Sequence, residues 1–228
     1  RKIGEGSFSM VFRAKYTVDQ CLYAVKRTKQ TVRDKFQVKE TYALASMASG
    51  VESCPNIVRY FSSWHERGQL FIQMELCEGS LRDHMHRRHE KHPTAPQYRS
   101  SEIAEVVASV ANGLKSIHTS GFVHLDIKPD NIMRGRSGGK WKIGDFGLAV
   151  VALNSGRDDL CEGDCRYLSR EVLQGDLSQL DKGDMFSLGA MAYELAGNPR
   201  PLPRQGENWH ALRDGFLDHM VVRDFPPA

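Results

Sequence analysis

The sequence Val-His-Leu-Asp-Ile-Lys-Pro-Asp-Asn at residues 123–131 decides how this chain is interpreted. Within it, Asp126 can orient a substrate hydroxyl group and accept its proton while a bond to phosphorus forms. Lys128, two residues later, can lie beside the phosphoryl group that is transferred. We therefore predict that Asp126 and Lys128 are catalytic residues for phosphoryl transfer.

Two further polar residues belong to the same pattern. Asn131 ends this first stretch, and Asp145 begins the sequence Asp-Phe-Gly at residues 145–147. Amide and carboxylate oxygens are hard ligands of the kind that Mg²⁺ prefers, and phosphoryl transfer from ATP uses Mg²⁺ to neutralise phosphate charge. The spacing predicts a metal site formed by Asn131 and Asp145, with ATP and Mg²⁺ as cofactors.

A glycine-rich segment opens the chain. The sequence Ile-Gly-Glu-Gly-Ser-Phe-Ser-Met-Val at residues 3–11 predicts a strand, a turn and a second strand. Because they lack a Cβ atom, Gly4 and Gly6 would let backbone N–H groups come close to phosphate groups. Taken alone, such a segment is more often an ordinary hairpin.

A lysine at the end of an apolar strand favours the phosphate interpretation. The sequence Leu-Tyr-Ala-Val-Lys at residues 22–26 places Lys26 where it can contact phosphate groups and a helix carboxylate. Glu40, in a helix expected at residues 35–47, is the candidate for that carboxylate. The alternative is that Glu40 is a solvated helix residue.

In this order and spacing, the four patterns resemble the eukaryotic protein kinase family. The resemblance implies an α+β, bilobal fold with a small β-rich N-lobe containing one helix and a mainly helical C-lobe. It divides the chain into an N-lobe at residues 1–74, a hinge at 75–77 and a truncated C-lobe at 78–228 that lacks the last helices of the family. Ser9 departs from the family, which usually has a third glycine at this position.

The resemblance also implies an adenine pocket. Met74 would guard its rear, and backbone groups of Glu75 and Cys77 would hydrogen-bond the base. The apolar walls would be Ile3, Val11, Ala24 and Met133, although each of these could equally be ordinary core.

Several segments narrow the resemblance to the Wee/Myt family, which inhibits cyclin-dependent kinases. Leu125 stands where most kinases have an arginine, and residues 162–168 read Glu-Gly-Asp-Cys-Arg-Tyr-Leu. Residues 58–64 (Val-Arg-Tyr-Phe-Ser-Ser-Trp) and 201–215 are similar as well. The implied partner is a cyclin-dependent kinase with its cyclin, phosphorylated on tyrosine or also on threonine. The Wee and Myt branches both remain open.

Two alternatives to this function are weighed. Residues 58–64 also resemble kinases of translation initiation factors, but those kinases keep the catalytic-loop arginine and lack the Glu-Gly-Asp segment. A pseudokinase or scaffold would bind nucleotide or a partner without catalysis. The presence of Lys26, Asp126 and Asp145 argues against it.

Leu125 predicts a mode of regulation. A buried arginine beside the catalytic aspartate needs an activation-segment phosphate to neutralise it, and leucine removes that need. Order in the segment at residues 145–171 would come instead from its own carboxylates, and we expect activity without prior phosphorylation. The carboxylates are Asp158, Asp159, Glu162 and Asp164, with Arg157, Arg166 or Arg170 as partners; Asp158 and Asp159 could equally be solvated.

Two other residues have expected structural roles. We expect Asp184 to begin a buried helix and to hold the backbone of the catalytic loop. The family places a glutamate at the position of Glu171, where it pairs with an arginine from a later helix.

Composition limits the kinds of partner and the cellular compartment that the sequence predicts. The net charge of +3 is too small to argue for nucleic acid or a membrane surface as partner, and the sequence has no run of eighteen apolar residues that would predict a membrane span. The five cysteines are odd in number and scattered, which is typical of reduced thiols. We therefore expect a nuclear or cytoplasmic location.

Periodicity gives a coarse outline of the elements. Strands are expected at residues 10–15, 21–26, 57–64 and 70–75, and an all-round apolar helix at 185–196. Ser100 or Ser101 would cap another helix that ends at Gly121.

Two histidine and cysteine groups could suggest a metal. The first is a histidine-rich segment at residues 84–99, where a solvated helix end and loop is the expected structure. A docking patch for an acidic partner is an intermediate possibility. The second is the pair Cys161 and Cys165, whose spacing is not a usual zinc spacing.

Overall fold

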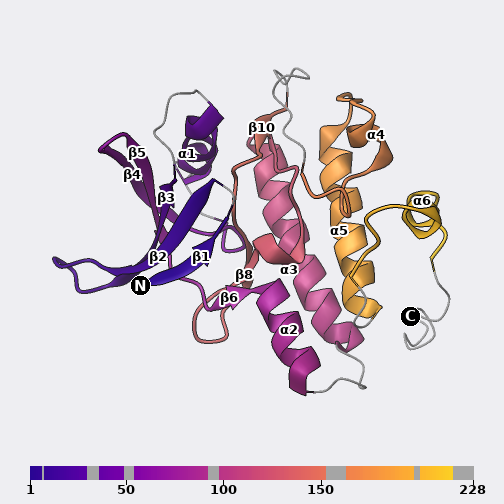
Figure 1. Ribbon diagram of the computed structural model, residues 1–228, viewed down its shortest axis with the longest axis horizontal. Coiled ribbons are helices and arrows are strands. Elements are labelled where there is room, and N and C mark those ends of the chain that lie inside the picture. The colour runs from indigo at the N-terminus through magenta and orange to yellow at the C-terminus, as the bar shows by residue number, and fades with distance from the viewer. Residues whose placement is uncertain are drawn as a thin grey trace.

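The computed structural model describes residues 1–6, 8–29, 36–48, 54–91, 98–152, 163–197 and 201–217. It has two parts, a β-rich part at the N-terminal side and a helical part that holds most of the remaining chain (Figure 1). This is the α+β arrangement that the sequence predicts.

Five antiparallel strands form the N-terminal sheet, in the order β1-β2-β3-β5-β4. Helix α1 (Phe36–Ala48) packs against one face of it, where Ala43 and Leu44 join Leu70 and Ile72 in the core. On the other face, described side chains such as Trp64 are partly exposed. The strands are β1 (Lys2–Glu5), β2 (Ser9–Lys15), β3 (Leu22–Thr28), β4 (Tyr60–Glu66) and β5 (Gln69–Glu75).

The helical part is built around α3 and α5, which lie side by side (Figure 1). Apolar residues at every third or fourth position of α3 form a buried stripe that packs on α5 and on the small strands. The helices are α2 (Leu81–Lys91), α3 (Ser100–Thr119), α4 (Arg170–Leu173), α5 (Leu180–Ala196) and α6 (Glu207–Arg213).

Short strands between the two parts carry the polar motifs. One small sheet has the order β6-β8-β9, and a second pairs β10 with β7. The catalytic loop, which is residues 124–131, begins directly after one short strand and ends directly before another. Both of its ends are therefore anchored. These elements are β6 (Gly79–Ser80), β7 (Phe122–Val123), the 3₁₀ turn η1 (Pro129–Asn131), β8 (Ile132–Arg134), β9 (Trp141–Ile143) and β10 (Val150–Val151).

Several predicted boundaries were wrong by a few residues. Strand β4 starts at Tyr60, because Ile57 makes only an isolated bridge to Ile143. Helix α5 starts at Leu180, so Asp184 lies inside the helix and does not begin it. The cap of α3 is Arg99, one residue before the predicted serines.

The C-terminal end of α3 also differs by one residue from the prediction. Ser120 is the C-cap, and Gly121 follows it with a φ of +81°. That left-handed conformation is one that glycine adopts without steric cost.

No helix among the described residues combines the length and apolar character that crossing a bilayer requires.

Candidate active site

Lys26 joins the two parts of the molecule. Its Nζ lies 2.7 Å from Oε1 of Glu40 on α1 and 2.8 Å from Oδ1 of Asp145. The side chains of Lys26 and Glu40 are 13% and 11% exposed. Burial alone would lower the pKa of Lys26, but the charges of Glu40 and Asp145 outweigh it and raise that pKa. Lys26 is therefore a fixed cation at the junction.

Asp126 is held by two neighbours in its own loop. Lys128 Nζ donates to its carboxylate at 2.8 Å, and Asn131 Nδ2 donates to Oδ2 at 2.7 Å and to its backbone oxygen at 2.8 Å. Since the amide nitrogen of Asn131 is engaged in this way, its amide oxygen is the group left for a metal ion. The donor set of Asn131 and Asp145 therefore fits Mg²⁺, which takes oxygen ligands.

The backbone of the catalytic loop is fixed from α5, as the sequence predicts. Asp184 is fully buried, and its carboxylate accepts the N–H groups of His124 at 2.9 Å and Leu125 at 2.8 Å. His118 Nε2 lies 2.8 Å from the same carboxylate. Leu125 has a φ of +62°, which is costly for a leucine and is maintained by these bonds.

Asp145 lies at the junction with half of its side chain exposed. Its φ of +56° turns the carboxylate towards Lys26, while the next residue, Phe146, is completely buried against the ring of His124. Burial opposes ionisation of Asp145, but the ammonium group of Lys26 outweighs it and keeps the pKa below its usual value. The carboxylate is thus charged and accessible to a cation.

The glycine-rich segment forms the hairpin of β1 and β2. The N–H of Gly6 donates to the carbonyl of Ser9 at 2.9 Å, and Gly4 pairs with Val11 across the two strands. Ile3 on β1 is half exposed. Ser7, at the tip, lies outside the described residues.

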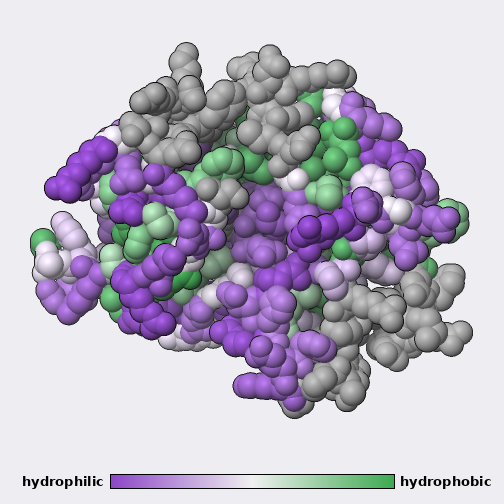
Figure 2. Space-filling view, viewed as in Figure 1, coloured by the Kyte–Doolittle hydropathy of each residue, from purple (hydrophilic) through white to green (hydrophobic). Residues whose placement is uncertain are grey.

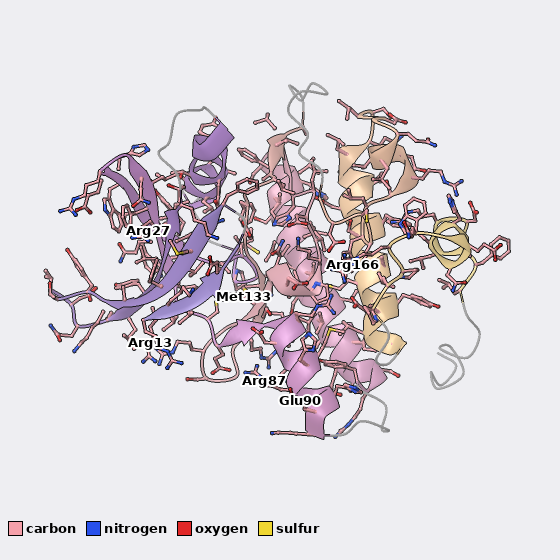
Figure 3. The ribbon with its side chains drawn as sticks, viewed as in Figure 1. Arg13, Arg27, Arg87, Glu90, Met133 and Arg166 are labelled. Atoms are coloured by element: carbon pink, nitrogen blue, oxygen red, sulfur yellow. The ribbon has the colours of Figure 1, made fainter. Side chains whose placement is uncertain are left out.

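The predicted adenine pocket lies at the end of the N-terminal sheet. Ala24 on β3 pairs with Met74 on β5, and Met133 lies at the junction of the sheet and the helices (Figure 3). The N–H of Glu75 donates to Arg59 O at 2.9 Å, so a contact of Glu75 with adenine would use its carbonyl group.

Side chains behind this segment fix it further. Oε1 of Glu75 accepts from Lys142 Nζ at 2.7 Å. Burial, followed by the nearby charge of Glu75, raises the pKa of the Cys77 thiol to about 12. The Glu75 carboxylate is thus paired with Lys142, and burial keeps the Cys77 thiol protonated.

The start of the Glu-Gly-Asp segment packs on the catalytic loop. A Cβ atom on Gly163 would lie 2.9 Å from the carbonyl oxygen of Leu125, so only glycine fits without a shift of the backbone. The Leu125 side chain belongs to a buried apolar cluster with Val123, Val150 and Leu180. The two loops therefore meet through packing, and the residues of this cluster that the structure describes are all apolar.

Asp164 pairs with Arg166, one of its three predicted partners. Arg166 Nε donates to Oδ1 of Asp164 at 2.9 Å. Burial would raise the pKa of Asp164, but the hydrogen bonds from Arg166 prevail and lower it. Arg170, another of the three alternatives, pairs with Asp214 just after α6.

The other residues with predicted roles in this segment are either exposed or lie outside the described residues. Glu171 is exposed on α4. The other named residues, Arg157, Asp158, Asp159 and Glu162, lie outside the described residues.

Two arrangements that support the segment were not predicted. Tyr167 donates to Glu194 at 2.6 Å and accepts from Arg82 Nη2 at 2.6 Å, a network that joins α2, α5 and the segment. Arg213 Nη2 donates to the carbonyls of Cys165 and Leu168, both at 2.6 Å. Neither arrangement could be recognised in the sequence, because the partners are far apart in the chain.

One histidine of the histidine-rich segment, His84, is less solvated than predicted. His84 is partly buried, and its Nδ1 lies 2.7 Å from the hydroxyl of Tyr98, because this turn of α2 faces Trp141. Burial, aided by nearby arginines, lowers the pKa of His84. Among the described residues, no three or more His, Cys, Asp or Glu side chains gather into a group that could hold a metal ion, and Cys161 and His92 lie outside that part of the chain.

Hydrophilic residues occupy the centre of the face shown in Figure 2, between the sheet and α5. A cation, carboxylates and an amide are thus assembled where two parts of the molecule meet. A family model described as a protein kinase domain matches residues 1–224. The chain belongs to the protein kinase family. The β-rich part, the helical part and the enzyme class all agree with this membership.

Three relatives of similar sequence show which kinases this chain resembles. The chain is 36% identical to Wee1-like protein kinase 2 of Xenopus tropicalis over its whole length, which is 42% of that relative. It is 37% identical to Wee1-like protein kinase 2 of Danio rerio, with 96% of this chain and 44% of the relative covered. It is 41% identical to the Wee1-like protein kinase of Oryza sativa subsp. japonica, with 95% and 39% covered. The kinase thus resembles Wee1-like kinases and spans about two fifths of their length.

Proposed function

We propose that this chain transfers the γ-phosphate of ATP to a tyrosine of a cyclin-dependent kinase, and so restrains entry into mitosis. The observation that carries the proposal is the similarity to Wee1-like kinases along the chain, together with the Glu-Gly-Asp segment packed on the catalytic loop. Threonine remains a second acceptor within the same proposal.

The roles of the side chains follow from their contacts. Asp126, held by Lys128 and Asn131, would orient the acceptor hydroxyl and take its proton. Lys128 would then face the transferring phosphoryl group with its remaining N–H donors. Lys26, fixed by Glu40, would hold the other phosphates of ATP. Mg²⁺, held by Asn131 and Asp145, would neutralise phosphate charge when bound.

The adenine end of the nucleotide would lie against the sheet. Ile3, Val11 and Ala24 would cover one side of the base and Met133 the other, with Met74 at the rear. The carbonyl of Glu75 and a backbone group of Cys77 would bind its edge, and Gly4 and Gly6 would approach the phosphates. All four described cysteines are free, which supports a reducing compartment, nuclear or cytoplasmic, as part of the proposal.

The test uses the full-length protein with a cyclin-dependent kinase–cyclin complex whose own catalytic aspartate has been replaced. With ATP and Mg²⁺, we expect phosphate on a tyrosine of the cyclin-dependent kinase, located by mass spectrometry, and lower activity when an active copy of the complex is modified in the same way. The Asp126→Asn variant serves as the control for a contaminating kinase. Phosphate on serine alone, or a complex left unmodified while a generic substrate is phosphorylated, would contradict the proposed acceptor.

A further inference from the structure

The outer face of the N-terminal sheet, turned away from α1 and from Lys26, is lined by side chains in register across four strands. Alternation along β3 places Ala24 and Lys26 on the inner face and their neighbours on the outer face. One cross-strand row reads Phe12, Val25, Gln73 and Ser62, and the next reads Met10, Arg27, Phe71 and Trp64.

Aromatic rings dominate this outer face and are open to solvent. Trp64 stacks on Phe71 with 5.2 Å between the ring centroids and 7° between the ring planes, yet it is 39% exposed. Tyr23 lies edge-on between Tyr16 and Phe61, which are 52% and 40% exposed. Trp64, Phe71, Tyr16 and Tyr23 border a concavity of about 620 Å³. Exposed Trp and Tyr gathered in one hollow are typical of protein-binding surfaces.

Arg27 brings a positive charge with an unpaired donor to this hollow. Its guanidinium lies 5.1 Å above the ring of Phe12, and its Nε is buried without a hydrogen-bond partner among the described residues. The charged residues that line the hollow are Arg27 and Lys15, both cations. A buried donor on a charged group is costly to leave unpaired, and a carboxylate would satisfy it.

We propose that this face docks an extended, acidic segment of another protein, whose apolar side chains enter the aromatic hollow while a carboxylate pairs with Arg27. A second copy of the chain is disfavoured because two such faces would bring like charges together. The hollow lies on the opposite side of β3 from Lys26, so docking there is separate from phosphoryl transfer and does not rest on the proposed substrate.

The experiment selects binders from a random library of short linear peptides displayed on phage, with the intact chain immobilised. We expect the enriched peptides to carry Asp or Glu beside aromatic or aliphatic residues. Arg27→Glu and Trp64→Ala should each weaken synthetic versions of these peptides about tenfold or more in fluorescence anisotropy. Selection repeated on Arg27→Glu should enrich basic peptides instead.

Arg13→Glu is the matched control. Arg13 lies on β2 next to Phe12 but on the other face, and the substitution changes the net charge equally (Figure 3). It should leave peptide binding within about twofold, and Arg27→Gln provides a milder variant should the reversal unfold the sheet.

Three results would overturn the proposal. In the first, no peptide is enriched, or the enriched set lacks acidic residues. In the second, the peptides bind Arg27→Glu or Trp64→Ala as tightly as wild type. In the third, sedimentation shows a dimer that Trp64→Ala dissociates, which would assign the face to a second copy.

Discussion

Two lysines contact carboxylates at the junction, and they differ in how their partners reach them. Lys26 is shared between Glu40 and Asp145, which lie 14 and 119 residues away in the chain. Lys128 contacts Asp126, only two residues away. The first site exists only when the sheet, the helix and the Asp-Phe-Gly segment are assembled, whereas the second is largely built into one loop.

This difference in sequence separation predicts different roles for the two lysine contacts. An ion pair between residues far apart in the chain forms only when the elements that carry them are assembled. Loss of either element leaves the other charge unpaired. A contact within one loop persists through such rearrangements and keeps the acceptor carboxylate oriented. Substitutions at the two sites should therefore have separable effects on nucleotide binding and on chemistry.

The largest effect is expected at the long-range site. Asp145→Ala removes the partner of Lys26 and the proposed metal ligand, so phosphate transfer should fall about 10³-fold or more. The measurement is transfer of radiolabelled phosphate over a range of Mg²⁺ concentrations. Asp181→Ala, which removes an exposed carboxylate on α5, is the control. Full Mg²⁺-dependent activity in Asp145→Ala would show that another residue holds the metal.

The local site should separate chemistry from binding. Asp126→Asn keeps an acceptor for Lys128 but loses the basic carboxylate, so turnover should fall about 10²-fold while ATP still binds. Steady-state kinetics and fluorescent-nucleotide titration measure the two quantities. Asp130→Asn is the matched control, in the same loop but exposed and paired with Arg82. Near-normal turnover of Asp126→Asn would rule out its catalytic role.

The smallest effect is expected from dephosphorylation. Leu125 packs with Val123, Val150 and Leu180, so at this position an apolar cluster stands where an arginine would need a phosphate to neutralise it. Phosphatase-treated protein should keep its activity within about twofold, measured with the same transfer assay after mass spectrometry confirms removal of phosphate.

A second variant sharpens this prediction about the activation segment. Asp164→Ala removes the partner of Arg166 and should lower activity about tenfold, because order here comes from fixed charges. A large loss on dephosphorylation, restored by phosphate on Ser155, would indicate the opposite design. Ser169 is a poor site for such a phosphate, since it is buried and its hydroxyl accepts the N–H of Val172.

The sequence predicted the parts of the fold and site that depend on short spacing. Asp126 and Lys128 were both identified from one short stretch of sequence, although their mutual contact was not predicted, and strand alternation places Lys26 inward as expected. The ends of helices and strands were less predictable. Helix α5, for example, starts about one turn earlier than predicted, and its first residue, Leu180, is buried in one apolar cluster with Leu125. That contact depends on the assembled fold.

Residues that support the site from a distance were not predictable. Arg213 binds carbonyl groups more than forty residues earlier, and Arg82 meets Glu194 across two helices. Neither arginine has a local acidic partner that would mark it in the sequence. Arg170 shows the same limit, since its nearness in sequence to the segment's carboxylates gave no sign of the ion pair that it makes with Asp214.

The surroundings of Cys77 have a consequence for chemical probes. Cysteine-directed electrophiles react with the thiolate, and a pKa of about 12 leaves about one thiol in 10⁵ ionised at neutral pH. An acrylamide warhead placed on an adenine mimic would thus find a nearby sulfur that barely reacts. Of the four cysteines that the structure describes, Cys21, just before β3, is the exposed one and would be alkylated first among them. Labelling of this kinase therefore has to be interpreted by position, because the first adduct among these four is expected at the outer end of the sheet.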